Sequence, residues 1–463
     1  MSRAEIRLPQ VFTDNMVLQR QTDAPIWGKA APNSEVTIAP SWDSLIFRVP
    51  TNGNGQWTTK IKTPDAGGPY TIAIACNDET VTLKNVLIGE VWICSGQSNM
   101  EMPLAGWGKV QNYEYEIAAA SFPKIRLLQV NKNTSAIPLS DLASTAGGWQ
   151  ECSPASIPEF SAVAYFFGRH LYEHLSVPIG LINTSWGGTI AEAWTSRESL
   201  MQMPEFVGQM EDVISKPETD DVKGNPNRPT VLYNAMIRPL APFAIRGAIW
   251  YQGESNADRA TQYRDLLPLM IRDWRKTWDN EFPFYFVQLA NYMKRQTEPQ
   301  ESRWAELREA QLRTLRLNNT GMAVAIDIGD ADDIHPKNKQ TVGERLALNA
   351  RALTYEEPIP YSGPIYRSYN IEDNRIRIVF GRAVDGLRTN DGKDLRGFAI
   401  AGPDHIFHWA KATMADENEL IVYAPEVKFP VAVRYAWADN PDCNLCDGTG
   451  LPASPFRTDD WQK

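Results

Sequence analysis

The sequence predicts an α/β protein with a three-layer α/β/α domain in the middle and β-rich, sandwich-like regions at both ends. Two changes of pattern support this fold class. Short strands between turn residues fill residues 1–86 and return over residues 356–463, whereas apolar strands alternate with helical stretches over residues 87–355. A chain of 463 residues has room for two or three domains. We therefore expect three regions, with a mostly parallel sheet in the middle one.

Residues 1–86 are expected to form an antiparallel, sandwich-like domain. Short runs of alternating apolar and polar residues are separated by turns rich in Gly, Asn, Asp and Pro, such as residues 52–55. The runs are residues 16–19, 24–28, 35–38, 45–49, 56–59 and 70–75.

The middle region has the pattern of successive βαβ units. Its candidate strands are apolar on both faces, as in a parallel sheet that helices cover on both sides. These strands are residues 88–94, 125–130, 179–183, 245–251, 284–290 and 322–328. The clearest helix starts at Tyr263, because apolar residues recur at helical spacing from there to Trp278. Further helices are predicted over residues 160–175, 302–317 and 338–354.

From residue 356 onward the pattern again predicts strands. Alternating runs occupy residues 374–380, 397–401 and 419–423. The tail 451–457 contains two prolines and predicts no regular structure. His405 and His408 lie in an aromatic-rich β stretch and are expected to be structural.

The composition argues against several classes of function. A net charge of −10 and an isoelectric point near 5.2 make a nucleic-acid partner unexpected. No apolar run reaches the length of a membrane span, and the first residues lack the apolar core of a signal peptide. The five cysteines are too scattered for a disulfide framework. Cys443 and Cys446 form a lone CxxC motif without a second pair, so we expect no zinc site there.

The stretch 88–102 contains the first candidate catalytic group. A short apolar strand ends at Ser95-Gly96, and Gln97-Ser98-Asn99 follows on a tight turn. A serine just past a buried strand has an exposed hydroxyl, and a helix that begins there directs backbone N–H groups at an oxyanion. Because Ser-Gly turns after strands are common, the assignment of Ser98 as a nucleophile depends on a base elsewhere in the chain.

Three further polar loops follow predicted strands of the middle region. They are residues 184–189, residues 252–256 and residues 329–336. In an open parallel sheet, ligands bind beyond the carboxyl ends of the strands. We therefore expect all of these loops to lie along the same edge of the sheet as Ser98.

His335 is the best-placed base among the five histidines. It lies in Asp332-Asp333-Ile334-His335, just before a predicted helix. A carboxylate three residues ahead, Asp332, can fold back to hold one ring N–H of His335, which leaves the other nitrogen to accept the proton of Ser98. The alternative is a helix-capping loop without chemistry.

Two other constellations remain open. His170 and His174 match the H-x-x-E-H pattern of some zinc proteases, but the helix that carries them has an apolar stripe, and the histidines fit its polar side. Glu254 paired with Glu192 or Asp327 would suit a glycosidase. Alternatively, Glu254 only braces its loop by accepting backbone N–H bonds.

With these residues in hand, the chain resembles the sialate O-acetylesterase family of carbohydrate esterases, in the SGNH/GDSL hydrolase clan. Four stretches carry the resemblance in order and in spacing, and the terminal residues 12–20 and 450–457 are also similar to this family. The four stretches are residues 89–100, 178–189, 250–256 and 333–339. The resemblance implies an SGNH-hydrolase fold for residues 87–355.

The resemblance also implies roles for individual residues. Ser98 would be the nucleophile, His335 the general base and Asp332 its orienting partner. The oxyanion hole would consist of the backbone N–H groups of Ser98 and Gly188 and the side chain of Gln252. The wider clan has an asparagine in the third motif, so Gln252 is a departure from its pattern.

The residues beside these positions, Gln97, Trp186 and Glu254, are expected to bind substrate. The activity implied by the resemblance is removal of O-acetyl groups from sialic acid, at the 9-O position, without a metal or another cofactor. Acetylxylan or another acetylated polysaccharide stays open as the substrate. A glycosidase that uses Glu254 and a non-catalytic carbohydrate-binding protein are the alternatives of other classes. The expected partner is an O-acetylated carbohydrate, and the resemblance favours a periplasmic or secreted location.

Overall fold

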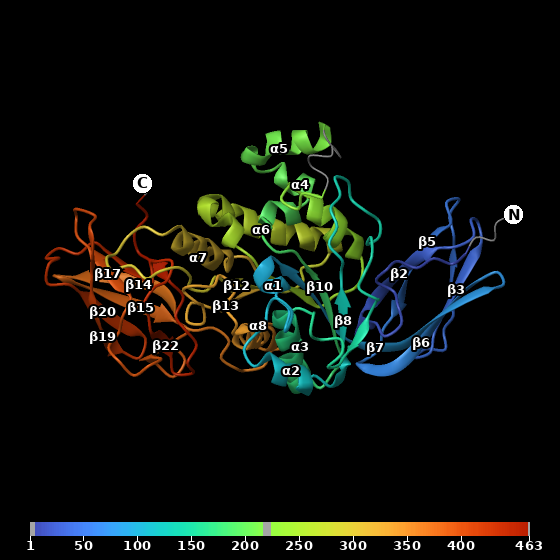
Figure 1. Cartoon of the computed structure of the whole chain (residues 1–463), viewed down its shortest axis with the longest axis horizontal. Helices are drawn as coiled ribbons and strands as arrows, with labels where there is room; N and C mark the ends of the chain where they lie inside the picture. The colour runs from blue at the N-terminus through green and yellow to red at the C-terminus, as the bar shows by residue number, and fades with distance from the viewer. Residues whose placement is uncertain (1–4, 216–223, 462–463) are drawn as a thin grey trace. The chain divides into compact units, whose positions relative to one another are not determined.

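The computed structural model describes residues 5–215 and 224–461 of the chain (Figure 1). The chain divides into two compact units. The first unit comprises Met1–Trp250 and Leu269–Phe284, and the second comprises Tyr251–Pro268 and Tyr285–Lys463. The predicted division into three regions stays a prediction.

The N-terminal strands form where the alternating pattern predicts them, and all six predicted runs contain a strand. β3, β4, β6 and the start of β7 pair in antiparallel fashion, β1 joins β7 in parallel, and β2 and β5 form a separate antiparallel pair. The strands are β1 (Val17–Gln19), β2 (Asp23–Lys29), β3 (Glu35–Pro40), β4 (Phe47–Pro50), β5 (Gln56–Lys62) and β6 (Gly67–Cys76).

Strand β7 (Glu79–Gly96) continues from this β-rich part into the central sheet. Its first residues alternate between half-buried and exposed, and every residue from Val86 onward is buried. This change follows from its neighbours, since a strand covered on both faces has no polar side. The boundary predicted after residue 86 therefore falls inside one continuous strand.

The central sheet is mixed rather than purely parallel. β7 pairs in parallel with β10 (Ile179–Ser185), and β10 pairs in parallel with β8 (Phe122–Gln129). β9 (Gln150–Cys152) runs antiparallel to β8. On the other side of β7 lies β11 (Gly247–Tyr251). The chain thus has a large mixed sheet with helices and additional β-rich regions, which confirms the α/β class.

Helices pack on both faces of this sheet. Trp92 of β7 meets Phe167 of α3 (Ala162–Leu175) edge to face, with ring centroids 5.1 Å apart. Trp250 of β11 meets Trp274 of α6 (Ala260–Trp278) in the same way at 5.8 Å. Figure 1 shows α3 and α6 on opposite sides of the strands. The other helical segments of the first unit are α1 (Ser98–Glu101), α2 (Tyr113–Ala119), η1 (Ala191–Trp194), α4 (Arg197–Leu200), α5 (Pro204–Ser215), η2 (Tyr233–Ile237) and η3 (Arg238–Leu240).

The second unit begins with the polar loop after β11 and continues through the last two strand–helix pairs. The helices predicted over residues 302–317 and 338–354 are confirmed, whereas the strand predicted over residues 322–328 ends at Val324. Residues 325–338 therefore form a loop in front of the last helix, although several of them are apolar. The elements are η4 (Glu254–Arg259), β12 (Phe284–Gln288), α7 (Arg303–Thr314), β13 (Thr320–Val324) and α8 (Lys339–Leu353).

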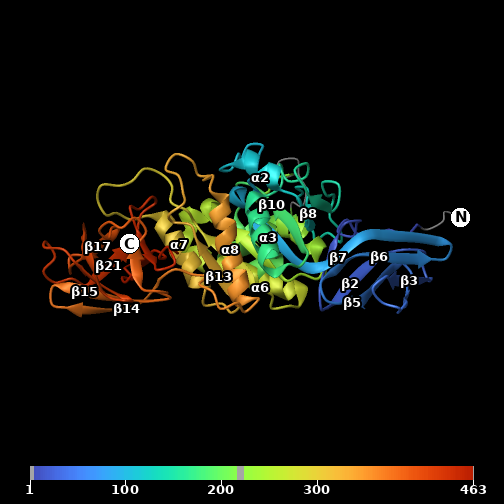
Figure 2. The same ribbon diagram turned by 90° about the horizontal axis from the view of Figure 1, so that it is seen from below.

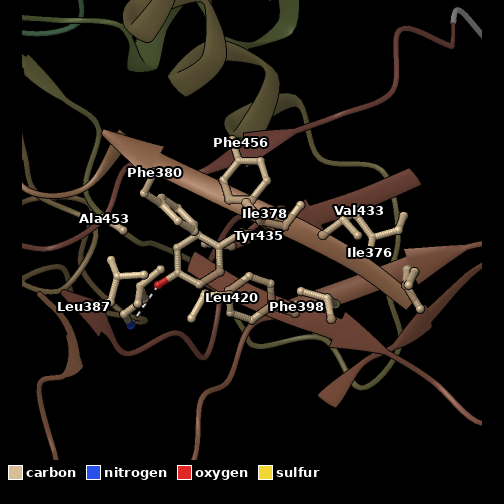
Figure 3. Packing of buried hydrophobic residues seen from close by; sticks show 14 of the residues in the cluster. Ile376, Ile378, Phe380, Leu387, Phe398, Leu420, Val433, Tyr435, Ala453 and Phe456 are labelled. Atoms are coloured by element: carbon tan, nitrogen blue, oxygen red, sulfur yellow. Dashed lines mark hydrogen bonds between the residues drawn. The ribbon is translucent and has the colours of Figure 1, made fainter. Parts of the chain in front are cut away.

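The C-terminal part of the second unit is a β-structure around its own apolar core (Figure 3). Phe456 packs against Tyr366 and Phe380, and the Tyr435 hydroxyl accepts a hydrogen bond from the Leu445 N–H at 3.0 Å. Because Phe456 belongs to strand β23, the prediction of no regular structure in the tail is wrong at this strand. The strands are β14 (Ile365–Glu372), β15 (Arg375–Gly381), β16 (Leu387–Thr389), β17 (Phe398–Ala401), β18 (Phe407–Trp409), β19 (Lys411–Asp416), β20 (Glu419–Tyr423), β21 (Ala432–Tyr435), β22 (Leu445–Asp447) and β23 (Phe456–Arg457).

Two further sequence expectations concern membranes and thiols. Across the described ranges, no helix is both long and apolar enough to cross a membrane. All five cysteines lie in these ranges and have free thiols, including Cys443 and Cys446.

Candidate active site

Ser98 is the first residue of α1, and only Gln97 separates it from the buried end of β7. Gly96, with φ +142°, turns the chain out of the strand, a conformation that favours glycine. The Ser95 hydroxyl donates a hydrogen bond of 2.6 Å to the carbonyl of Thr184 and so ties the end of β7 to β10. Gln97, one of the expected substrate-binding residues, is buried.

The glycine loop after β10 lies beside Ser98. β7 and β10 are parallel, and their last paired residues are Gly96 and Ser185. The loops that follow the two strands therefore lie at the same edge of the sheet. The Trp186 N–H donates to the Gly96 carbonyl at 3.0 Å. A Cβ on Gly187 would lie only 3.2 Å from the Cβ of Ser98. Gly187 therefore gives the loop its close approach to the serine.

Gly188 occupies the most open position of this loop. Its φ is +73°, and a Cβ placed there would have no atom within 4 Å. The Asn227 side chain holds the turn from outside, because its Nδ2 donates to the Gly188 carbonyl at 3.0 Å and its Oδ1 accepts from the Ile190 N–H at 3.1 Å. The carbonyl of Gly188 is thus fixed by a side chain that the sequence did not single out.

Glu101 connects the serine turn with the glycine loop. Its Oε2 accepts a hydrogen bond from the Gly187 N–H, and its Oε1 lies 2.6 Å from Nζ of Lys132. The Lys132 ammonium also lies 5.6 Å from the ring centroid of Trp186, within the range of a cation–π contact. The half-buried indole of Trp186 is therefore positioned through this glutamate–lysine pair.

In the second unit, the side chain of Gln252 is completely buried and held from both ends. Its Oε1 accepts a hydrogen bond of 2.8 Å from the Tyr263 hydroxyl, and its Nε2 donates to Asn256 Oδ1 at 2.6 Å. Gln311 Nε2 additionally donates to the Gln252 carbonyl at 3.1 Å. An amide bonded in this way has one orientation, which an oxyanion donor requires.

His335 lies in the loop between β13 and α8, close to the carboxylate of Asp333. Asp333 Oδ1 accepts the backbone N–H of His335 at 2.8 Å and lies 3.6 Å from its Nδ1. Asp332, which was expected from the sequence to hold the ring N–H of His335, is exposed. Its own backbone N–H donates to Asp330 Oδ1 at 2.9 Å. The contact to the histidine thus belongs to the neighbouring aspartate.

Lys339 is a buried cation close to this loop. Its Nζ donates to the Pro336 carbonyl at 2.7 Å and lies 5.6 Å from the ring centroid of Tyr251. Burial lowers the pKa of Lys339 to about 7, while the negative charges of Glu254 and Asp333 partly oppose this decrease. Burial, reinforced by the charge of Glu254, also raises the pKa of Tyr251. The loops 252–256 and 329–336 are therefore coupled electrostatically within the second unit.

The geometry gives little support to the alternative glycosidase and metal sites. Asp327 forms a bidentate ion pair with Arg345, at 2.6 and 2.8 Å, so its carboxylate is already used structurally. The rings of His170 and His174 stack at 4.4 Å, and His174 Nδ1 bonds to the His170 carbonyl at 2.7 Å. Over the described ranges, no three His, Cys, Asp or Glu side chains form a group that could hold a metal ion.

The remaining predicted positions are buried or stacked on neighbours. Glu192 is almost completely buried in η1. His405 stacks on Trp461 with ring centroids 3.7 Å apart, and His408 belongs to β18.

Several residues that shape the site escaped the sequence analysis. Glu101 and Lys339 both lie inside or next to recognised motifs, so their position in the chain was a usable signal. Asn256 ends the recognised motif 250–256, so its position was a signal as well. Asn227 and Tyr263 act through contacts with residues more distant in the sequence, and nothing in their local pattern points to these contacts.

Comparison with known proteins identifies the class. A family model described as carbohydrate esterase, sialic acid-specific acetylesterase, matches residues 88–352. The sialate O-acetylesterase of Mus musculus is 31% identical over 96% of this chain and 93% of its own length. That of Homo sapiens is also 31% identical, over 97% of this chain and 92% of its own. The crystal structure of a carbohydrate acetylesterase from Xanthomonas citri is 38% identical, with a TM-score of 0.90 over 99% of this chain and 100% of that chain.

A mixed α/β fold with a serine at the end of a buried strand and a glycine loop beside it is an arrangement suited to acyl transfer, and these matches place the chain among the carbohydrate esterases. The chain belongs to the sialic acid-specific acetylesterase family of these enzymes. The resemblance found in its sequence motifs is thereby confirmed.

Proposed function

We propose that this chain removes O-acetyl groups from sialic acid, with Ser98 as the nucleophile and His335 as the general base. Family membership and the similarity to mammalian sialate O-acetylesterases support the substrate class. The single structural observation that carries the proposal is the packing of Gly187 against Ser98, which sets a glycine turn alongside a serine at the end of a buried strand.

The reaction is a two-step acyl transfer. Ser98 Oγ attacks the acetyl carbonyl carbon, His335 accepts the hydroxyl proton, and the same histidine then protonates the departing sugar oxygen. His335 then takes a proton from a water molecule that attacks the acyl carbonyl. The bond between the acyl carbon and Ser98 Oγ breaks, acetate leaves, and the histidine returns the proton to Ser98 Oγ. No metal enters any of these steps.

Three hydrogen-bond donors are proposed to stabilise the oxyanion. They are the backbone N–H groups of Ser98 and Gly188 and the side-chain amide of Gln252. The open surroundings of Gly188 leave room for a ligand atom, and the bonds from Gln252 to Tyr263 and Asn256 fix the amide plane.

The carboxylate that orients His335 comes from the Asp332-Asp333 pair. Asp332 has the spacing that the resemblance implies, whereas Asp333 makes the contact with the histidine. We propose that Asp333 supports the imidazolium and that Asp332 remains the alternative to be tested against it.

Three neighbouring residues are proposed to contact the substrate. Trp186 offers a half-buried aromatic face beside Lys132, which suits a sugar ring. Gln97 adjoins the nucleophile in the chain, and Glu254 opens the segment after Gly253. For the middle region, residues 87–355, we propose the three-layer arrangement of SGNH hydrolases.

The test is acetate release by the full-length protein from 9-O-acetylated sialic acid and from acetylated xylan, measured side by side. The Ser98→Ala protein is expected to lose activity on both substrates. Ser95→Ala is the matched control, because this serine lies on the same strand end but its hydroxyl is bound to the Thr184 carbonyl.

Release from sialic acid that disappears in Ser98→Ala and persists in Ser95→Ala supports the proposal. Equal activity of the wild type and Ser98→Ala would remove the serine from the mechanism, and Glu254→Gln with a glycoside substrate would then test the glycosidase alternative. Cleavage of acetylated xylan alone would transfer the proposal to another acetylated carbohydrate.

A further inference from the structure

The N-terminal β-rich part of the first unit contains a cavity of about 780 Å³ that shares no lining residue with the loops around Ser98. Its wall includes the paired strands β2 and β5, which Figure 2 shows next to each other, together with residues 7–9, residues 49–50, Asn52, residues 140–141 and Pro242. Its volume lies in the range of pockets that hold small-molecule ligands, ~300–1,000 Å³. The catalytic proposal leaves this cavity without a role.

The register of β2 and β5 explains which side chains share one face of this wall. Trp27 lies opposite Thr58, and Lys29 lies opposite Gln56. Side chains directly opposite each other in an antiparallel pair point to the same face, and so do residues two positions apart on one strand. An indole, a hydroxyl, an ammonium group and an amide therefore stand side by side along the cavity.

Trp27 supplies an aromatic surface held in place by a neighbour. The edge-to-face contact between Phe12 and Trp27, with ring centroids 4.7 Å apart, fixes the indole. Trp27 is only partly buried, so part of its indole stays accessible where it lines the cavity. A fixed aromatic face next to hydroxyl and amide groups is suited to a sugar ring, which presents C–H groups on its faces and hydroxyls at its edge.

The charges of the cavity are unlike those of the whole chain. Over the described ranges, neither the Arg7 guanidinium nor the Lys29 ammonium forms an ion pair, and both residues line the cavity. The carboxylate of Asp141 accepts the N–H groups of Gln10 at 3.0 Å and Leu142 at 2.8 Å. A protein with a net charge of −10 thus has a cavity in which two unpaired cations face one bonded carboxylate.

We propose that this cavity is a second, non-catalytic site that binds a carboxylated sugar. The sugar ring packs on Trp27, its carboxylate pairs with Lys29 or Arg7, and its hydroxyls bond to Thr58 and to the amide of Gln56. The site goes beyond the proposed esterase activity and does not depend on Ser98. It would hold an acidic sugar residue of a glycan, or the free sugar acid, while the catalytic serine acts elsewhere on the protein.

The experiment is a calorimetric titration of the full-length Ser98→Ala protein with N-acetylneuraminic acid, which has no O-acetyl ester to cleave. Adding Trp27→Ala or Lys29→Met is expected to weaken one binding event by about tenfold or more, the effect of losing one charged or stacked contact. Lys60→Met is the matched control, because Lys60 is an exposed lysine of β5 that does not line the cavity.

The outcomes separate this proposal from the esterase proposal. The uncharged sugar N-acetylmannosamine is expected to bind at least about tenfold more weakly than the sugar acid, because it lacks the charge-assisted contact. Binding that Lys29→Met and Trp27→Ala leave unchanged, or equal binding of both sugars, would overturn the acidic-sugar site. Ester hydrolysis by Lys29→Met in the otherwise wild-type protein should stay at the wild-type rate whichever result the titration gives. Because Lys29 is exposed, its substitution keeps the test valid even if Trp27→Ala unfolds the β-structure.

Discussion

Asp333 Oδ1 lies 3.6 Å from Nδ1 of His335 and, at 2.8 Å, accepts the backbone N–H of the same histidine. The backbone bond fixes the turn, and the longer distance to the ring is within the reach of an ion pair but exceeds that of a hydrogen bond. The structure thus places the carboxylate of Asp333 next to the imidazole of His335, the base proposed above.

The first prediction concerns the choice between the two adjacent aspartates. Asp333→Asn should lower kcat on the order of a hundredfold or more, because an amide cannot support the imidazolium as a carboxylate does. Asp332→Asn removes a similar charge from an exposed side chain and should change kcat much less. Steady-state kinetics of both variants decides the question, and a larger loss in Asp332→Asn would reverse the assignment.

The second prediction concerns Gln252, the side chain proposed as an oxyanion donor. Gln252→Ala should raise the barrier on the order of 3 kcal/mol, or about a hundredfold in kcat. It should also lower the free energy of unfolding by about 1–3 kcal/mol, because Tyr263 and Asn256 lose a buried partner. Tyr263→Phe is the control, since it removes the hydroxyl bond but leaves the amide N–H groups of Gln252 in place. A Gln252→Ala protein with wild-type kcat would remove this residue from the oxyanion hole.

The third prediction compares the two glycines next to Ser98. Gly187→Ala should reduce kcat, because the new Cβ would sit 3.2 Å from the Cβ of Ser98 and force the serine or the loop to move. Gly188→Ala meets no atom but must adopt φ +73°, which costs about 1–2 kcal/mol of stability in a residue with a side chain. Kinetics should therefore show a lower kcat for Gly187→Ala, and melting curves should show a lower stability for Gly188→Ala. An unchanged kcat in Gly187→Ala would show that the loop moves aside without displacing Ser98 and would contradict this prediction.

The fourth prediction is the pH dependence that Lys339 gives to stability. Its pKa falls from its ordinary value of 10.5 to about 7 on folding, so between these pH values the unfolded chain holds the proton more tightly. The contribution of Lys339 to the free energy of unfolding therefore rises with pH across this window, by at most about 1.4 kcal/mol per pH unit, and is constant below pH 7.

Urea unfolding of the wild type and of Lys339→Met, repeated between pH 6 and pH 10, checks this relationship. The difference in the free energy of unfolding between the two proteins should shift in favour of the wild type as the pH rises above about 7, the pKa of the buried Lys339 amine in the folded chain. A difference that is the same at every pH would mean that Lys339 keeps its ordinary pKa in the folded protein.

The fifth prediction concerns the completely buried carboxylate of Glu90 in β7. It pairs with Arg20 and, at 2.6 Å, with Arg246. Glu90→Ala would leave two arginines without this partner and should lower the free energy of unfolding by about 3–5 kcal/mol. Glu35→Ala breaks the pair with Arg48, in which both side chains are mostly exposed, and should cost no more than about 1 kcal/mol. Similar costs for both substitutions, measured by chemical denaturation, would contradict this.

The elements that could be predicted are those with a local signal. Residues 70–75 alternate between apolar and polar, and residues 88–94 form a continuous apolar run, and both patterns predict strands that the structure contains. The helical spacing of apolar residues from Tyr263 onward predicts α6. Two element ends were missed. The apolar residues Ala325, Ile326 and Ile328 continue the pattern of β13 although the strand has already ended, and Phe456 pairs with β21 despite its proline-rich neighbourhood.

The sequence by itself determined the class of fold, the family, and the loops that carry the candidate chemistry, because periodicity, turn residues and motif spacing are properties of neighbouring positions. It did not determine which aspartate contacts His335, since Asp332 and Asp333 differ by one position and the folded turn selects between them. Only the tertiary structure decided the burial that lowers the pKa of Lys339 and the cavity where Arg7 and Lys29 meet residues from a distant loop. Desolvation and unpaired charge depend on everything that packs around a group, and most of those neighbours are far away in the chain.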